Sequence, residues 1–127
     1  GDGWDSEKLT EIGGNAIMGG YFSNHYSHED KNAVVQNFVA NYKAKFGEIP
    51  NGLAAMGYDA AIVAIDAAKR ASDLSPPAIR DALTKTANFQ GVTGIITINA
   101  ERNAVKPAVV LKVAGNNEFH YVTTVNP

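Results

Sequence analysis

The sequence predicts an α/β fold whose helices cover a sheet that this chain supplies only in part. One strand pattern is followed by three consecutive helical patterns, and the remaining strand patterns gather near the C-terminus. A self-contained doubly wound domain would alternate strand and helix throughout. The second of the three helices, residues 53–71, is apolar almost all round, so we expect it to be buried on most sides. The sheet that these helices need is expected to lie largely outside this sequence.

A short helix and one strand are predicted at the N-terminal end. Leu9, Ile12 and Ala16 recur at helical spacing, and the glycines that follow weaken and end the helix. Residues 20–23 then predict a brief, buried strand.

Three helices are predicted in the middle of the chain. Ser27 and Asp30 have the spacing of a capping box, which predicts a helix start there, ahead of an apolar stripe over residues 34–46. The helix over residues 53–71 comes next, and Asp59 near its start is predicted to favour the positive helix end. A third helix begins after Ser75, where two prolines occupy the turn that tolerates them.

The last part of the chain has the pattern of strands and tight turns. Gly91 and Gly94 flank a predicted bend, and strands are predicted over residues 95–98 and 108–113. Gly115-Asn116-Asn117 can supply the positive φ values of a hairpin turn. We therefore expect a β-hairpin at the C-terminal end.

Composition argues against several functions. The 127 residues carry 11 basic and 13 acidic side chains, a net charge of −2, so no strongly basic field exists to attract nucleic acid. The absence of Cys removes zinc–thiolate sites and cysteine nucleophiles. No Gly-x-Ser-x-Gly, phosphate loop or carboxylate pair is present, and His25 and His28 lack a distant third ligand. We expect no catalytic residues, no metal site and no cofactor.

Six short motifs occur in a fixed order along the chain. They are Gly1-Asp2-Gly3-Trp4, Gly20-Tyr21-Phe22, Lys45-Phe46-Gly47, Gly57-Tyr58-Asp59-Ala60, Phe89-Gln90-Gly91-Val92-Thr93-Gly94 and Lys106-Pro107-Ala108. Together they resemble the C-terminal part of type I periplasmic solute-binding proteins, specifically the branched-chain amino-acid (Leu/Ile/Val-binding) class of ABC transporter receptors. Each motif is weak alone, and their order over essentially the whole chain carries the resemblance.

The resemblance implies a two-lobed α/β protein, longer than this chain, with parallel sheets flanked by helices and a ligand in the cleft between the lobes. By that mapping, residues 1–19 and 107–122 belong to the second lobe and residues 20–100 to the first. The crossings between lobes fall near residue 20 and at residues 102–107. A missing N-terminal portion would supply most of both sheets.

The resemblance also implies a ligand-binding site at the N-terminal loop. In relatives that bind α-amino acids, the acidic residue of the GDGW-like motif, here Asp2, pairs with the ligand's α-ammonium group. Such a charge-assisted hydrogen bond in a closing cleft is worth ~1.5–3 kcal/mol. Gly3, Trp4, Tyr21 and Phe22 are the further candidates for ligand contact. The alternative for Asp2 is a purely turn-forming role, and for the aromatic residues it is packing.

The function implied is that of the substrate-binding component of an ABC importer. It would capture a small amino acid of branched-chain type, or a related carboxylate, and deliver it to a membrane permease from the periplasm, or from the extracellular side when membrane-anchored in a Gram-positive organism. The alternative is a sensory or receptor ligand-binding module, or a fragment that assembles into a homo-oligomer by swapping segments.

Overall fold

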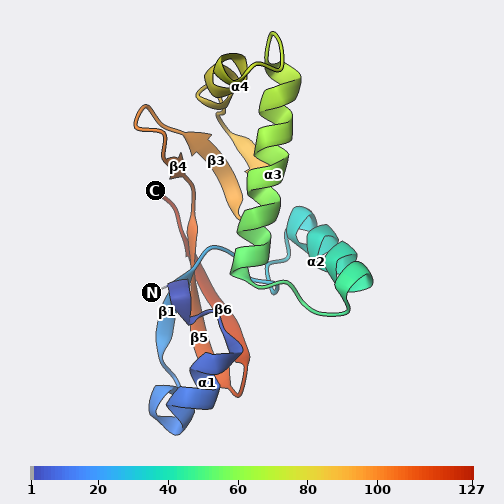
Figure 1. The fold of residues 1–127 in the computed structure, drawn as a ribbon. Helices are drawn as coiled ribbons and strands as arrows, with labels where there is room; N and C mark the ends of the chain where they lie inside the picture. The colour runs from blue at the N-terminus through green and yellow to red at the C-terminus, as the bar shows by residue number, and fades with distance from the viewer. Residues whose placement is uncertain (1) are drawn as a thin grey trace.

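The structure, a computed structural model, describes residues 2–127, apart from the side chains of Asp2 and Glu7. It is elongated and has two bodies, a sheet with α1 at one end and the longer helices with a small sheet at the other (Figure 1). The elements in chain order are η1 (Asp2–Trp4), α1 (Glu7–Gly13), η2 (Gly14–Ile17), β1 (Tyr21–Asn24), α2 (Ala33–Phe46), α3 (Gly52–Arg70), α4 (Pro76–Leu83), β2 (Phe89–Gly91), β3 (Gly94–Ile98), β4 (Ala104–Val105), β5 (Ala108–Gly115) and β6 (Glu118–Val125).

The first body is built on an antiparallel sheet in the order β1-β5-β6. Phe22 lies opposite Leu111 in the β1–β5 pair, and both side chains point to the buried face. Val109 and Val113 complete that core, against which Phe119 packs. The alternation of buried and exposed residues along β5 follows from the two-residue period of a strand with one covered face.

The second body has its core between α2, α3 and the β2–β3 turn. Tyr26, Val35, Phe38, Ala55 and Val92 form this cluster. The small antiparallel sheet β2-β3-β4 lies beside α3. The α4 end is joined to α3 by Arg70, whose guanidinium donates to the Ala82 carbonyl and the Thr86 hydroxyl.

The α/β class and the C-terminal hairpin are confirmed. Strands β5 and β6 pair as a hairpin, and Asn117 has a φ of 56° in its turn. All strand pairs in the described part of the chain are antiparallel, whereas the resemblance implied parallel sheets. Strands joined by short turns pair antiparallel, while parallel pairs need long crossover connections.

Two local predictions differ from the structure. Helix α2 begins after Asn32, whose side chain accepts a hydrogen bond from the Val34 amide, instead of at the predicted capping box. Ser27 is buried and closes a turn by accepting from the Glu29 amide. Strand β1 is half exposed, because Tyr21 points away from the core and leaves 59% of its surface accessible.

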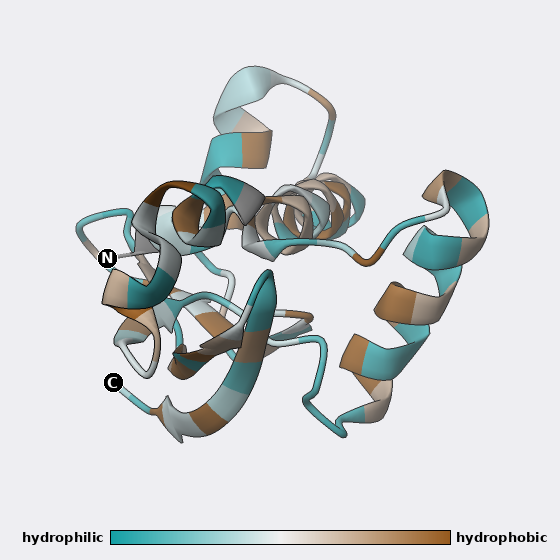
Figure 2. Cartoon of the chain, turned by 90° about the horizontal axis from the view of Figure 1, so that it is seen from below, coloured by the Kyte–Doolittle hydropathy of each residue, from teal (hydrophilic) through white to brown (hydrophobic). Residues whose placement is uncertain are grey.

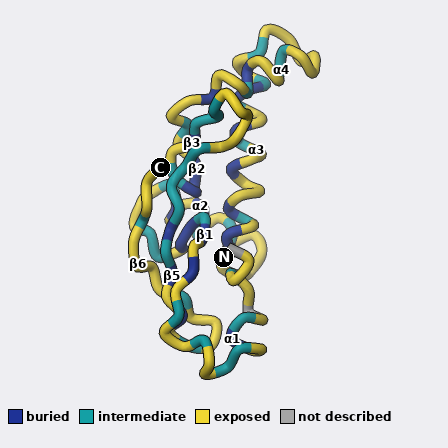
Figure 3. The backbone as a smooth tube through the Cα atoms, turned by 90° about the vertical axis from the view of Figure 1, so that its left-hand side faces the viewer, coloured by how far each residue is buried: buried dark blue, intermediate teal, exposed yellow. Residues whose placement is uncertain are grey.

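Helix α3 is covered on one side only. Its buried positions face the sheet and α2, while its outer side is exposed (Figure 3). Hydrophobic residues nevertheless occur on more than one side of it (Figure 2), and Leu53 and Ile65 are exposed. The expected burial on most sides is thus not met within this chain. Among the described residues, no helix is long and apolar enough to cross a lipid bilayer.

Candidate functional site

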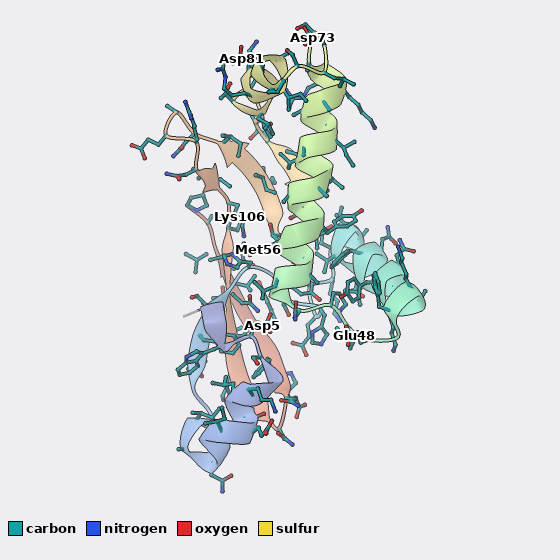
Figure 4. All side chains as sticks on the ribbon, viewed as in Figure 1. Asp5, Glu48, Met56, Asp73, Asp81 and Lys106 are labelled. Atoms are coloured by element: carbon teal, nitrogen blue, oxygen red, sulfur yellow. The ribbon has the colours of Figure 1, made fainter. Side chains whose placement is uncertain are left out.

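A hollow of about 540 Å³ lies between the two bodies. Three segments form it: the N-terminal loop with the start of α1, the end of β1, and the first turns of α3. Asp5 and Met56 lie on either side of this junction in Figure 4. The lining residues are Gly3, Asp5, Ser6, Lys8, Asn24, His25, Asn51, Gly52, Leu53 and Met56.

The floor of the hollow depends on a close approach at Gly52. The Gly52 amide donates to the Asp5 carboxylate, which ties the N-terminal loop to the start of α3. A Cβ atom at position 52 would lie 2.5 Å from Asn24 Oδ1 and 2.8 Å from Asp5 Oδ2. Only glycine fits between these two polar side chains without displacing them.

Replacing Gly52 by Ala is therefore expected to lower the free energy of unfolding by about 1–3 kcal/mol, because the added methyl group pushes Asp5 and Asn24 apart. The matched control is Gly57→Ala on the same helix, where a Cβ meets nothing within 4 Å. That change should instead stabilise the protein by about 0.5–1 kcal/mol. Urea unfolding of both variants checks the pair, and equal effects would contradict this account.

The electrostatics of the hollow combine both signs of charge. Asn51 caps α3 by accepting from the Ala54 amide, so the positive end of the helix borders the hollow. Behind it, Lys106 Nζ lies 3.2 Å from His25 Nδ1. Burial lowers the pKa of the Lys106 ammonium group, and the nearby Asp59 carboxylate opposes that shift. The Asp5 carboxylate, the Lys8 side chain and the positive end of α3 border the hollow, so the hollow suits a small molecule that carries both charges.

An apolar wall accompanies the polar groups. Leu53 and Met56, on the first turns of α3, line the hollow, and Leu53 leaves 73% of its surface accessible. Exposed apolar side chains beside polar groups are typical of sites that orient a small ligand. Among the side chains that the structure describes, no group of three or more His, Asp or Glu residues is placed to hold a metal ion.

The structure separates the predicted contact residues. Gly3 lines the hollow, whereas the Asp2 side chain lies outside the described residues. Trp4 leaves 39% of its surface exposed and its ring lies 6.2 Å from that of Phe22. Phe22 is in the sheet core, and Tyr21 faces outward beneath Lys112 Nζ. None of the three aromatic residues lines the hollow, and their ligand contacts remain predictions.

Sequence reasoning missed the contribution of α3. Asn51 and Gly52 come just before the helix predicted over residues 53–71, and neither is among the predicted contact residues. The contact between Gly52 and Asp5 spans 47 residues and has no local signature. Met56 lies within the apolar helix pattern over residues 53–71, and nothing in its spacing distinguishes a ligand-facing methionine from a core one.

The chain matches solved structures over most of its length. The leucine binding protein LivK from Thermotoga maritima is 40% identical, and the match covers 99% of this chain and 36% of that one with a TM-score of 0.87. The branched-chain amino acid transporter substrate binding protein LivJ from Streptococcus pneumoniae, in complex with isoleucine, is 31% identical over 99% of this chain and 36% of its own, with a TM-score of 0.83.

A third match is a solute binding protein of an ABC transporter from Rhodopseudomonas palustris in complex with 3,4-dihydroxybenzoic acid. It is 28% identical over 89% of this chain and 32% of its own, with a TM-score of 0.71. The fold is therefore that of part of an ABC-transporter solute-binding protein.

The sequence profile described as periplasmic binding protein matches residues 2–117, and the chain belongs to this family. The family is one of solute-binding proteins, not a class of enzymes. A search of curated proteins finds no match. The chain spans about a third of the length of the solved relatives named above.

Proposed function

We propose that this chain is the C-terminal part of the substrate-binding component of an ABC importer, which captures a branched-chain type of α-amino acid between two lobes and delivers it to a membrane permease. The observation that carries the proposal is the hollow at the junction of the two bodies, which the GDGW-like segment borders. Closure around a ligand that touches both lobes would be a population shift. The protein would bind its ligand without converting it, in the periplasm or on the extracellular side of the membrane.

The sheet pairing refines the proposed division into lobes. Strand β1 pairs with β5, so we place residues 21–24 with the second lobe instead of the first. The crossing expected near residue 20 then moves to residues 25–32, between β1 and α2. The other crossing stays at residues 102–107, and the helices between them belong to the first lobe. The two separate hydrophobic clusters support this division.

The groups around the hollow suggest how a ligand would be held. Asp2 would accept hydrogen bonds from the ligand's α-ammonium group, as the resemblance implies. Leu53 and Met56 would face its aliphatic side chain. The ligand carboxylate would be bound mainly by the N-terminal portion, so this chain alone should bind its ligand poorly.

A second groove supports the proposal that an N-terminal portion completes the fold. An apolar groove of about 260 Å³ runs between α3 and β3 and is lined by Val63, Thr93, Ile96 and others. The Thr93 hydroxyl oxygen is buried and has no hydrogen-bond partner within the described residues. Buried polar atoms in complete folds are nearly always paired. A strand of the N-terminal portion, laid along this groove, would supply the partner and cover the exposed side of α3.

The alternative ligand is an aromatic carboxylic acid. The relative from Rhodopseudomonas palustris was solved with 3,4-dihydroxybenzoic acid, and it belongs to the same fold class. Such a ligand carries no ammonium group and would not need Asp2. The two ligand classes therefore differ in their dependence on that one carboxylate.

Calorimetric titration of the full-length protein tests the proposal. We expect leucine, isoleucine or valine to bind, and Asp2→Ala to weaken that binding by about 10- to 150-fold, which corresponds to the loss of one charge-assisted hydrogen bond. Asp81→Ala, an exposed Asp on α4 far from the hollow, is the control and should bind normally. Binding of 3,4-dihydroxybenzoate alone, or unchanged amino-acid affinity in Asp2→Ala, would overturn the amino-acid assignment.

A further inference from the structure

The loop between β1 and α2, residues 25–32, is held by both bodies. On one side, Tyr26 is buried in the core beside Phe38 and donates from its hydroxyl to the Pro50 carbonyl at 2.6 Å. Burial raises the pKa of Tyr26 above its ordinary value, with a smaller contribution from Asp5, so this hydroxyl stays a donor. The loop is thus anchored firmly in the helical body.

On the other side, Glu29 contacts the edge strand of the larger sheet. Its Oε2 accepts from the Tyr121 backbone amide at 2.7 Å, and its Oε1 lies 2.9 Å from His120 Nδ1. Strand β6 is the outer strand of the β1-β5-β6 sheet, so no further strand covers these groups within the described chain. These contacts join residues that are 91 and 92 positions apart and tie the loop to the sheet body.

The two contacts of His120 depend on its protonation state. Nδ1 faces the Glu29 carboxylate, while Nε2 lies 3.2 Å from Glu118 Oε1. A carboxylate oxygen only accepts, so both ring nitrogens must carry hydrogen for both contacts to be bonds. The arrangement as a whole therefore requires the imidazolium form. A neutral ring can keep one contact, but it then turns a lone pair toward the other carboxylate.

Other charged groups belong to the elements that carry Glu29 and His120 or pair with them. Lys112 lies directly opposite His120 on β5, with its ammonium group over the Tyr21 ring at 5.8 Å from the ring centroid. His28, Asp30 and Lys31 belong to the same loop as Glu29. Glu29, with a smaller contribution from Glu118, raises the pKa of His120, and the hydrogen bonds from Tyr121 and His120 lower the pKa of Glu29.

We propose that Glu29 and His120 form a pH-dependent latch that ties the crossing segment to β6 and favours one arrangement of the two lobes while His120 is protonated. The proposal rests on the proposed two-lobed function and extends it to regulation of the same hinge. Relative motion of the bodies must release one anchor of the loop. The Tyr26 anchor is buried, whereas the side chains of His120 and Glu29 are 49% and 33% exposed, so the latch is the anchor that gives way.

The sign of the pH effect follows from the directions of the two pKa shifts. The latch is complete when Glu29 is ionised and His120 is protonated. It is lost as the pH rises through the raised pKa of His120, and again as the pH falls through the lowered pKa of Glu29. Mild acidity should thus favour the latched arrangement.

Spin-label distances in the ligand-free, full-length protein test this latch. This chain contains no Cys, so Ala64→Cys on α3 and Ala114→Cys on β5 provide labelling sites in the two bodies. From about pH 5 to about pH 8 we expect the latched-to-released ratio to fall by about two- to fivefold, the range of an exposed ion pair. The midpoint should coincide with the titration of the His120 ring followed by NMR.

Three variants decide the outcome. His120→Gln and Glu29→Gln should abolish the pH dependence, whereas His28→Gln, which removes a neighbouring histidine from the same loop, should retain it. A distance distribution that does not change with pH, or a pH dependence that persists in His120→Gln, would overturn the latch. Because the distances are measured without ligand, failure to bind amino acids would leave this result standing, and the two proposals can fail separately.

Discussion

Replacing Asp59 by Ala is expected to lower the free energy of unfolding by about 3–5 kcal/mol. Asp59 is 3% exposed, and its two carboxylate oxygens accept from the backbone amides of Val92 and Thr93, each at 2.7 Å. Hydrogen bonds to a charged group are worth about 1.5–3 kcal/mol each, and the variant would leave both donors buried without partners. Urea unfolding monitored by circular dichroism measures the loss.

The control for this prediction is a carboxylate on the same helix that lacks buried partners. Asp66 pairs with Arg70 one turn later, and both side chains are partly exposed. Asp66→Ala should therefore cost about 0.5 kcal/mol or less. Asp59→Asn keeps one accepting oxygen and should fall between the two Ala variants. Similar losses for Asp59→Ala and Asp66→Ala would show that the β2–β3 turn does not depend on Asp59.

Asp59 also shows where sequence reasoning reached its limit. Its place in an Ala-rich segment predicted a role near the positive helix end, but α3 begins at Gly52, seven residues earlier. The carboxylate instead holds the turn between β2 and β3, more than thirty residues away. Gly91 fits the same contact, because a Cβ there would lie 2.7 Å from Asp59 Oδ2. The motifs at residues 57–60 and 89–94 are thus parts of one structural contact.

The helices were predictable because each carries its own periodicity and its own stop signals. The apolar stripe over residues 34–46 matches the extent of α2, although the capping box at Ser27 predicted its start too early, and Gly47 ends the helix with a φ of 81°. Pairing between distant segments was not predictable. The β1–β5 pair joins residues nearly ninety positions apart, and the strand pattern of β1 does not specify its neighbour.

The candidate site, too, was predictable from the sequence only in part. The GDGW-like loop was identified through the resemblance, and without it Asp2 would be one more Asp in a glycine-flanked turn. The hollow itself depends on the approach of the N-terminal loop to the start of α3, which is set by Asp5 and Gly52. The local sequence around these residues does not predict their contact, because Asp is common in turns and Gly is common at helix boundaries.

The second large loss of stability is expected on substitution of Phe22, a residue for which packing and ligand contact can be tested separately. Phe22 is 3% exposed and meets the Phe119 ring edge-on, with centroids 5.2 Å apart, as well as the Trp4 ring. Truncation of a buried Phe to Ala typically costs 3–5 kcal/mol through lost apolar contact and the cavity left behind. We expect Phe22→Ala to lower the urea midpoint accordingly.

The neighbouring Tyr21 is the matched control, because it belongs to the same strand and points to the opposite face. Its ring is exposed and meets only the Lys112 ammonium group among the ring contacts described, so Tyr21→Ala should cost about 1 kcal/mol or less. Ligand titration of the folded variants completes the comparison. If Phe22 serves packing, a milder variant such as Phe22→Leu should bind ligand with unchanged affinity while still losing stability. A large loss of affinity in Phe22→Leu at conditions where the variant is fully folded would instead return Phe22 to the ligand-binding site.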